Sequence, residues 1–362
     1  MTNKVFFTPG PSELYPTVSA HMQSAMENKI GSISHRSQEF KDIYAHAVAG
    51  LRKFLQLPDD YEVLFLSSAN EIWERAIQNL VKEESFHLVN GSFSKRFYEI
   101  STELGRKASK HEVPFGEGFR LNDMAIPETA ELVALIHNET SSGVSMPVAD
   151  IAQFRKLAPA EALLFVDAVS SLPHPEFDYS KLDSVYFSVQ KCFGLPAGLG
   201  VWLLNERCLA KAHELQRQGI SLGSYHAIPS LVEKGRANQT PETPNVLNLY
   251  LLGKVVDDMN KKGIATIRQE TETKAKLIYD FLEKSENFEP AVQNPAFRSA
   301  TTIVANTQIP ASELNKLLSP YDMAIGSGYG SYKDKQIRIA NFPAHSVSQV
   351  EALIYKLESL EV

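Results

Sequence analysis

The chain has 362 residues, long enough for roughly two domains. Hydrophobic residues make up 43% and charged residues 22%, a composition typical of folded globular proteins rather than disordered or fibrous ones. The net charge of −7 and the lack of a Lys/Arg-rich run exclude the electrostatic pattern of a nucleic-acid-binding protein.

Redox and targeting features indicate where the protein works. The two cysteines, Cys192 and Cys208, are too few for a disulfide framework and suit a reducing compartment. The N-terminal residues lack the apolar core of a signal peptide, and no apolar run is long enough to span a bilayer. We therefore expect a cytoplasmic protein that binds neither membrane nor nucleic acid.

The N-terminal part of the chain is expected to contain an extended lead-in and two helices. Residues 5–16 include three prolines, which exclude a regular helix or a central strand. Helices are then predicted over 16–28 and, from a strong amphipathic pattern, over 37–57. His35 and Arg36 precede the second helix. An arginine there is usually a solvated surface charge, but it could also bind an anionic group together with the helix N-terminus.

Strand and helix patterns alternate between residues 61 and 204, which is the signature of a doubly wound, mostly parallel sheet. The strands are predicted at 61–66, 86–90, 108–113, 132–137, 162–167, 185–189 and 201–204. The intervening helices are predicted at 71–81, 95–104 and 150–157. Ligands of such sheets bind at the carboxyl ends of the strands, so the loops at those ends are the candidate site.

An acid and an amine follow two of these strands: Asp167 ends one, and Lys191 follows another. A buried lysine can lose its proton readily and form a Schiff base. A carboxylate opposite it could keep the pyridinium nitrogen of pyridoxal phosphate protonated, so that the ring acts as an electron sink. A solvated loop lysine is the commoner case, and many strands end in Asp, so this pair alone does not identify the site.

Three further loops could contact the same ligand. The small residues at 67–70 precede a helix, where backbone N–H groups can hold a phosphate or where Ser and Asn can simply cap the helix. Phe93 could stack on a flat ring or belong to the core. Residues 138–143 form a polar loop after the strand predicted at 132–137.

The pattern changes after residue 204, where long helices precede a smaller α/β unit. The helices are predicted within 206–235 and over 245–262, 264–284, 311–319 and 346–360, and the strands over 300–305 and 336–341. Arg338 lies inside an apolar strand, either as an edge-strand surface residue or as a clamp for a carboxylate in a cleft. We expect a large domain over 16–260 and a small domain made of 1–15 and 261–362.

Several motifs occur in order along the chain. They are Phe-Thr-Pro-Gly-Pro at 7–11, Ser-His-Arg-Ser at 34–37, Asn-Gly-Ser-Phe-Ser-Lys at 90–95, Asn-Glu-Thr at 138–140, Val-Asp-Ala-Val-Ser-Ser at 166–171, Ser-Val-Gln-Lys at 188–191, Thr-Pro-Glu-Thr-Pro at 240–244 and Arg-Ile-Ala-Asn-Phe-Pro at 338–343. Together they resemble the class V aminotransferases, which are pyridoxal-phosphate enzymes of fold type I, and most of all the phosphoserine aminotransferase group among them. The resemblance covers nearly the whole chain.

The resemblance implies roles for the residues around the cofactor ring. Lys191 would form the Schiff base with pyridoxal phosphate and then carry the proton between substrate and cofactor. Asp167 would bind the pyridinium nitrogen. Phe93 would stack on the ring, at a position where phosphoserine aminotransferases usually have Trp. Thr140 would form a hydrogen bond with the 3-hydroxyl group.

The resemblance also implies how the cofactor phosphate is held. Ala69 and Asn70 would offer backbone N–H groups to it, with Gln190 beside it. Thr240 would reach the cofactor phosphate of the neighbouring subunit. A homodimer with shared active sites is therefore implied, and no metal is expected.

The substrate would be bound by three further residues. Arg338 would clamp the α-carboxylate, and His35 with Arg36 would help to bind a substrate phosphate. The implied reaction transfers the amino group of O-phospho-L-serine to 2-oxoglutarate, giving 3-phosphohydroxypyruvate and L-glutamate in serine biosynthesis.

The chain also departs from the family pattern. Ser67-Ser68 stands where the family usually has Gly-Gly, and Asn70 replaces what can be Arg or Thr. Residues 328–333 replace a His-Arg pair that some members carry before the carboxylate-binding arginine, and Lys333 could supply the missing charge. This departure leaves an alternative open: an alanine or serine–glyoxylate, or serine–pyruvate, aminotransferase. A desulfurase needs a cysteine on a mobile loop, and both cysteines of this chain stand elsewhere.

Overall fold

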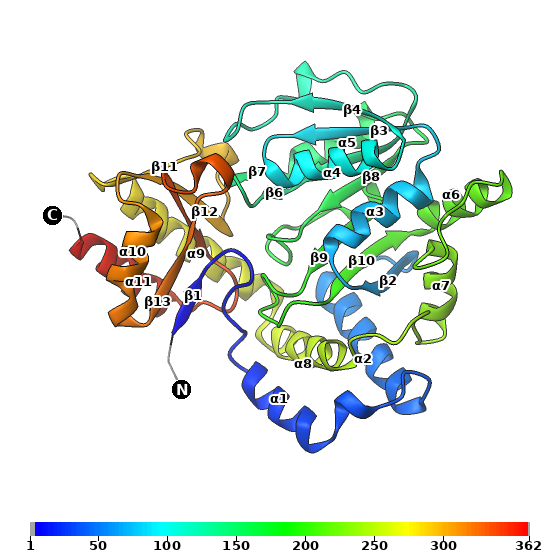
Figure 1. Cartoon of the computed structure of the whole chain (residues 1–362), viewed down its shortest axis with the longest axis horizontal. Helices are drawn as coiled ribbons and strands as arrows, with labels where there is room; N and C mark the ends of the chain where they lie inside the picture. The colour runs from blue at the N-terminus through cyan, green and yellow to red at the C-terminus, as the bar shows by residue number, and fades with distance from the viewer. Residues whose placement is uncertain (1–3, 361–362) are drawn as a thin grey trace.

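A computed structural model describes residues 4–360, and two β-sheets organise them (Figure 1). The larger sheet consists of β2 (Tyr61–Leu66), β3 (Glu84–Val89), β4 (Lys107–Glu112), β5 (Ala130–Ile136), β8 (Leu163–Asp167), β9 (Ser184–Ser188) and β10 (Gly200–Asn205). Their order is β2-β10-β9-β8-β5-β3-β4. Strand β10 is antiparallel to both neighbours, and the other pairs are parallel. The predicted α/β fold with a mostly parallel sheet is confirmed.

Helices cover both faces of the large sheet. One face carries α1 (Val18–Glu27), α2 (Gln38–Leu55), α5 (Val148–Leu157) and α8 (Val246–Lys262). The other carries α3 (Ala69–Leu80), α4 (Ser92–Glu103), α6 (Glu206–Arg217) and α7 (Ile228–Arg236). Alternate residues of a strand enter the two cores, since Val166 of β8 packs in the first and Phe165 in the second. Burial on both faces explains why the central strands β8 and β9 are mostly apolar in the sequence, whereas the edge strand β4 is polar and partly exposed.

The smaller sheet is built from both ends of the chain. Its strands, in spatial order, are β1 (Val5–Phe7), β13 (Met323–Ser327), β14 (Gln336–Ala340), β12 (Thr302–Thr307) and β11 (Phe288–Pro290). Three helices, α9 (Ile264–Leu282), α10 (Ala311–Leu318) and α11 (Val347–Ser359), share a core with it. The N-terminal lead-in therefore forms a short edge strand instead of merely an extended segment. The domain bounds at 16–260 and at 1–15 with 261–362 stay a prediction.

Two helices begin earlier than predicted, and both changes bear on the site. Helix α3 begins at Ala69 instead of residue 71, because the Ser68 hydroxyl accepts a hydrogen bond from its first turn (3.3 Å). Helix α4 begins at Ser92 instead of residue 95, because the Glu139 carboxylate accepts the N–H of Ser94 (2.9 Å). Among residues 4–360, no helix is long and apolar enough to cross a membrane.

Candidate active site

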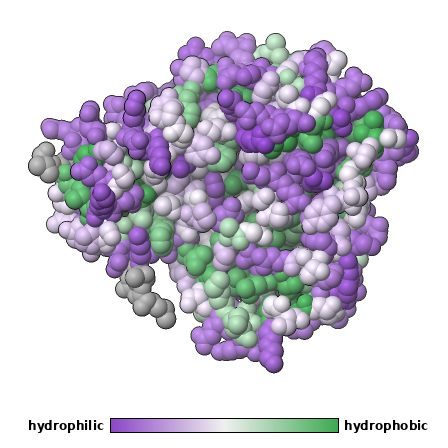
Figure 2. Space-filling view, viewed as in Figure 1, coloured by the Kyte–Doolittle hydropathy of each residue, from purple (hydrophilic) through white to green (hydrophobic). Residues whose placement is uncertain are grey.

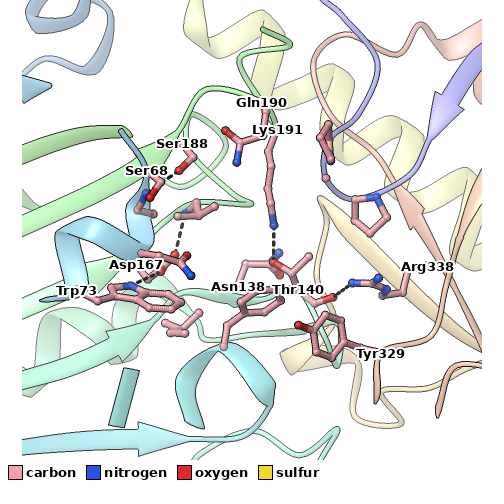
Figure 3. Close-up of a pocket in the computed structure, with 18 residues that line it drawn as sticks. Ser68, Trp73, Asn138, Thr140, Asp167, Ser188, Gln190, Lys191, Tyr329 and Arg338 are labelled. Atoms are coloured by element: carbon pink, nitrogen blue, oxygen red, sulfur yellow. Dashed lines mark hydrogen bonds between the residues drawn. The ribbon is translucent and has the colours of Figure 1, made fainter. Parts of the chain in front are cut away.

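A cavity of about 250 Å³ lies where β5, β8 and β9 end, and Arg338 of β14 borders it from the small sheet (Figure 3). Eight residues predicted from the sequence line it: Ala69, Asn70, Phe93, Thr140, Asp167, Gln190, Lys191 and Arg338. The other three, His35, Arg36 and Thr240, do not line it. The cavity thus occupies the edge of the sheet at which α/β proteins bind ligands.

Lys191 lies at the centre of this cavity. Strand β9 ends at Ser188, so the lysine belongs to the following turn and not to the strand end itself. Its Nζ donates a hydrogen bond to Thr140 Oγ1 at 3.1 Å and lies 5.3 Å from the centre of the Phe93 ring. Burial lowers the pKa of the ammonium group to about 8, although the Asp167 charge opposes this shift. A neutral, nucleophilic amine is therefore accessible near physiological pH.

The N-terminal lead-in covers Lys191. Gly10 has a φ of +138°, and a Cβ atom added there would lie 2.9 Å from Lys191 Cε. Only glycine allows the backbone to pass so close in this conformation. Ser12 N donates to Gln190 O at 3.2 Å and fastens the lead-in to the lysine turn. The Phe-Thr-Pro-Gly-Pro motif is thus part of the cavity wall.

Asp167 ends β8 on the opposite side of the cavity from Arg338 (Figure 3). Burial raises the pKa of its carboxyl group to about 7. Two donors oppose that effect: Val169 N binds Oδ1 at 2.9 Å and Trp73 Nε1 binds Oδ2 at 3.1 Å. Sequence reasoning missed Trp73, although it stands four positions after Ala69 on α3 and so shares its side of the helix.

The start of α3 forms another wall. Ala69 and Asn70 are its first two residues, whose backbone N–H groups have no acceptor within the helix. Ala69 N donates instead to Ser188 Oγ at 3.0 Å, so this hydroxyl is a further polar group at the wall. Sequence reasoning did not single out Ser188, because nothing local shows which strand end faces the helix.

Phe93 lies in the first turn of α4, and the side chain of Glu139 binds the N-terminus of this helix. The buried carboxylate of Glu139 accepts hydrogen bonds from the N–H groups of Phe93 (3.4 Å) and Ser94 (2.9 Å). A negative group at a helix N-terminus is favourable. The neighbouring Thr140 donates its hydroxyl to Ser170 Oγ at 2.8 Å. The Asn-Glu-Thr motif therefore orients both an aromatic ring and a hydroxyl toward the lysine.

Arg338 is partnered within the cavity. Strand β14 lies between β13 and β12, so the edge-strand interpretation is wrong. The guanidinium donates to Ser327 O at 2.7 Å and Thr140 O at 3.3 Å, and it lies 5.3 Å from the Tyr329 ring centre. Tyr329 in turn packs against Phe93, with ring centres 5.2 Å apart. Sequence reasoning identified residues 328–333 as a departure from the family pattern but assigned no role to this tyrosine.

A second cluster, which we call the Arg36 cluster, joins residues 35–36 to residues 239–243. Arg36 donates to Gln239 Oε1 and Thr240 O at 2.8 Å each and to Pro241 O at 3.1 Å. His35 Nδ1 lies 3.4 Å from Thr243 Oγ1. Arg36 is exposed but bonded to the protein, so the interpretation as a merely solvated charge is wrong.

A buried ionic link connects the Arg36 cluster to the cavity wall. His226 binds Glu71 of α3 at 2.5 Å and Glu242 of the 239–243 segment at 2.7 Å. Burial opposes its charge, but the hydrogen bonds to Glu242 and Glu71 raise the pKa of the imidazole to about 9. Lys333 does not line the cavity, and the suggestion that it supplies a charge to the substrate phosphate stays a prediction.

Comparison with known proteins decides the family. The family model described as aminotransferase class-V matches residues 4–334. The chain belongs to the class-V aminotransferases. Among curated proteins, the phosphoserine aminotransferase of Rhodococcus opacus is 29% identical over 355 residues, which cover 96% of this chain and 93% of that protein.

Solved structures extend the comparison. This class-V aminotransferase matches the crystal structure of a phosphoserine aminotransferase SerC from Cytophaga hutchinsonii with a TM-score of 0.98 and 59% identity, over 99% of each chain. An alanine–glyoxylate aminotransferase from Nostoc sp. matches with a TM-score of 0.83 and 21% identity, over 98% of this chain and 94% of that one. At that identity the second match shows the fold alone.

The cofactor of this class-V aminotransferase is pyridoxal phosphate, and the cavity fits it. A buried amine that reaches neutrality near pH 8 suits an aldehyde, and a carboxyl group held by two N–H donors suits a ring nitrogen. A helix start suits a phosphate. An amino acid and a 2-oxo acid are the substrates that the family implies.

Proposed function

We propose that this chain is a phosphoserine aminotransferase, which transfers the amino group of O-phospho-L-serine to 2-oxoglutarate in serine biosynthesis. The 59% identity with the Cytophaga hutchinsonii phosphoserine aminotransferase, over 99% of both chains, carries the proposal. Curated relatives from Rhodococcus and Nocardioides with 28–29% identity bear the same name.

The residues proposed to bind the cofactor determine where protons are held and moved during the reaction. When bound, pyridoxal phosphate supplies an electron sink for the charge left when the substrate Cα loses its proton. Lys191 accepts and returns that proton as its amine, with Thr140 orienting Nζ at 3.1 Å. Asp167 would hold the ring nitrogen, and a cationic partner there would favour the ionised carboxylate. Phe93 covers one side of the space near Nζ and excludes water from it.

Arg338 binds the substrate carboxylate. A guanidinium has five N–H donors. Among the described residues, two carbonyl oxygens accept from Arg338, which leaves donors for a bidentate contact with a carboxylate. Tyr329 supports the guanidinium from its ring face.

The experiment is a visible absorbance spectrum of the purified protein before and after addition of O-phospho-L-serine. We expect a yellow protein that bleaches on addition, because the amino group has passed to the cofactor. A yellow protein that ignores phosphoserine but bleaches with alanine or serine would instead support the alternative activity, an alanine or serine–glyoxylate or serine–pyruvate aminotransferase. The missing His-Arg pair within 328–333 is the observation that favours this alternative.

A homodimer with shared active sites is part of the proposal. His35, Arg36 and Thr240 do not line the cavity of their own chain, as expected if they serve the neighbouring one. Figure 2 shows hydrophobic surface in the region where Figure 1 draws α8. Ile43 of α2 and Tyr250 of α8 are partly exposed hydrophobic residues. We also expect a cytoplasmic location.

Subunit complementation tests the shared site. A chain with Lys191→Ala and a chain with Arg36→Ala are each expected to be poorly active alone when the phosphoserine concentration is kept well below the native KM. A hybrid dimer contains one site with both native residues, so co-expression should restore up to about half of the native activity for phosphoserine. Sedimentation of the native protein as a monomer, or no restoration in hybrids that form, would contradict the proposal.

A further inference from the structure

We propose that Trp73 is a positioning residue for Asp167. Its indole N–H fixes one carboxylate oxygen and favours the ionised acid that the pyridinium nitrogen of the cofactor requires. The inference rests on the cofactor part of the proposed function and not on phosphoserine as the substrate.

The geometry of the carboxylate carries this inference. Trp73 Nε1 donates to Asp167 Oδ2 at 3.1 Å, and Val169 N donates to Oδ1 at 2.9 Å (Figure 3). Each oxygen is thereby held by one donor, and further lone pairs remain for a ring N–H. Because an indole can only donate, its hydrogen bond strengthens when the acid ionises. The Trp73 contact therefore both orients the Asp167 carboxylate and favours its ionised form.

The indole is itself held firmly. Trp73 is 2% exposed, and its ring stacks on Phe97 with centres 5.5 Å apart and an interplanar angle of 13°. Phe97 meets His87 edge-on at 5.1 Å. A donor fixed by packing orients its acceptor at little entropic cost. Trp202, in contrast, donates to Ser184 Oγ at 2.8 Å and does not line the cavity.

The electrostatic surroundings define which groups titrate near Trp73. Burial raises the pKa of Asp167 to about 7 and lowers the pKa of Lys191 to about 8. The charge of Glu139 also faces Asp167, and burial raises the pKa of the Tyr186 hydroxyl far above neutrality. Burial lowers the pKa of His87 to about 3, so it stays neutral near pH 7. Asp167 and Lys191 are therefore the groups that change charge here around neutral pH.

The fluorescence of Trp73 tests the contact directly. The chain has two tryptophans, so Trp202→Phe leaves Trp73 as the only one. In the cofactor-free full chain, its emission should change with pH with a midpoint near 7, as Asp167 ionises. Adding Asp167→Asn should abolish the change, and adding Lys191→Met should move the midpoint upward because a positive neighbour is lost. A flat titration, or one that persists with Asp167→Asn, would overturn the inference.

Cofactor affinity tests the consequence. Trp73→Phe should weaken pyridoxal phosphate binding about tenfold at pH 7, since a hydrogen bond to a charged group is lost. Part of this loss should be recovered at pH 9, where Asp167 ionises without help. Trp202→Phe is the matched control and should bind as the native chain does at both pH values. A loss that is equal at pH 7 and pH 9, or no loss, would indicate a merely structural tryptophan.

These readouts involve no amino acid substrate. A protein that fails to use phosphoserine can still show both effects, and a phosphoserine aminotransferase can lack them. If Trp73→Phe does not fold, the single-tryptophan titration still decides, because Trp73 is intact in that variant.

Discussion

The cavity around Lys191 and the Arg36 cluster are both made of residues expected in the site, but they are built differently. In the cavity, Lys191 and Asp167 are buried, and their pKa values move toward neutrality. In the Arg36 cluster, an exposed arginine binds the carbonyl groups of the 239–243 segment. The cavity therefore adjusts the protonation of its own groups within a single chain. The Arg36 cluster instead fixes the conformation of the 239–243 segment.

This difference separates two tasks. Burial and fixed donors tune the protonation of a catalytic group, and a single domain core can provide both. The proposed function assigns recognition of the substrate phosphate to the Arg36 cluster, which lies outside the cavity of its own chain. We therefore expect changes at Lys191 and Asp167 to affect turnover and changes in the Arg36 cluster to affect KM.

The largest effect is expected for Lys191→Ala. Turnover should fall roughly a thousandfold or more, because both the Schiff base and the general base are lost. Initial rates with phosphoserine and the visible spectrum would measure it. Lys274→Met is the matched control: Lys274 is another buried lysine, with a pKa that burial lowers to about 8, but it binds Phe342 O and His345 O outside the cavity. Near-native rates of Lys191→Ala would contradict the assignment.

Asp167→Ala should follow, with a fall in kcat of roughly a hundredfold or more, the scale of losing a group that holds a proton in the transition state. Cofactor binding should weaken less than kcat, because the remaining contacts persist. The comparison of kcat with the cofactor dissociation constant measures this. An unchanged kcat would argue against the role of Asp167.

Arg338→Lys sharpens the comparison from the substrate side of the cavity. A lysine cannot form the bidentate contact, so KM for both the amino acid and the oxo acid should rise roughly tenfold to a hundredfold, as for charged hydrogen bonds. Steady-state kinetics with both substrates measure it, and the cofactor spectrum is the control. An unchanged KM for either substrate would place its carboxylate elsewhere.

Arg36→Ala breaks the Arg36 cluster and should raise KM for phosphoserine about tenfold, with kcat and the cofactor spectrum nearly unchanged. Arg52→Ala is the control, since Arg52 lies at the other end of α2 and binds the carbonyl oxygen of Pro58 just beyond that helix. An unchanged KM for phosphoserine would favour the alternative substrates that carry no phosphate.

A different kind of effect concerns the stability of the fold and its dependence on pH, not catalysis. The pKa of His226 is raised to about 9, so its ionic link stabilises the fold fully below about pH 6.5 and less as pH rises through 9. Burial raises the pKa of Glu71, but its hydrogen bonds to His226 and Ser67 lower it to about 2, so it stays charged in this range. His226→Gln should therefore cost about 2 kcal/mol near pH 6 and little near pH 10.

Denaturant unfolding at several pH values would measure this difference. His46→Gln is the control, because His46 forms a similar but exposed contact with Asp257. A cost that does not depend on pH would mean that His226 is held by packing and not by charge.

The elements of the fold were largely predictable because their signals are local. Apolar runs marked the strands of the large sheet, and periodic apolar positions marked α2 and α8. The three-residue strands β1 and β11 were missed, since so short a segment has no period of its own. The five-residue strand β13 was also missed, because it contains a glycine and leads into a glycine-containing turn. The predicted starts of α3 and α4 were a few residues too late. The group that caps α3, Ser68, is adjacent in sequence, but the group that binds the start of α4, Glu139, is distant in the chain.

For the candidate site, the order of residues along the chain predicts which groups follow strand ends, and Lys191, Asp167 and Thr140 do line one cavity. The groups around them become visible only in the folded chain: Trp73 at the acid, Ser188 at the helix start and Tyr329 beneath Arg338. The physical reason is that a strand end sets the position of one residue, whereas a contact depends on how two elements pack. That packing is settled by the whole core and leaves no local pattern in the chain.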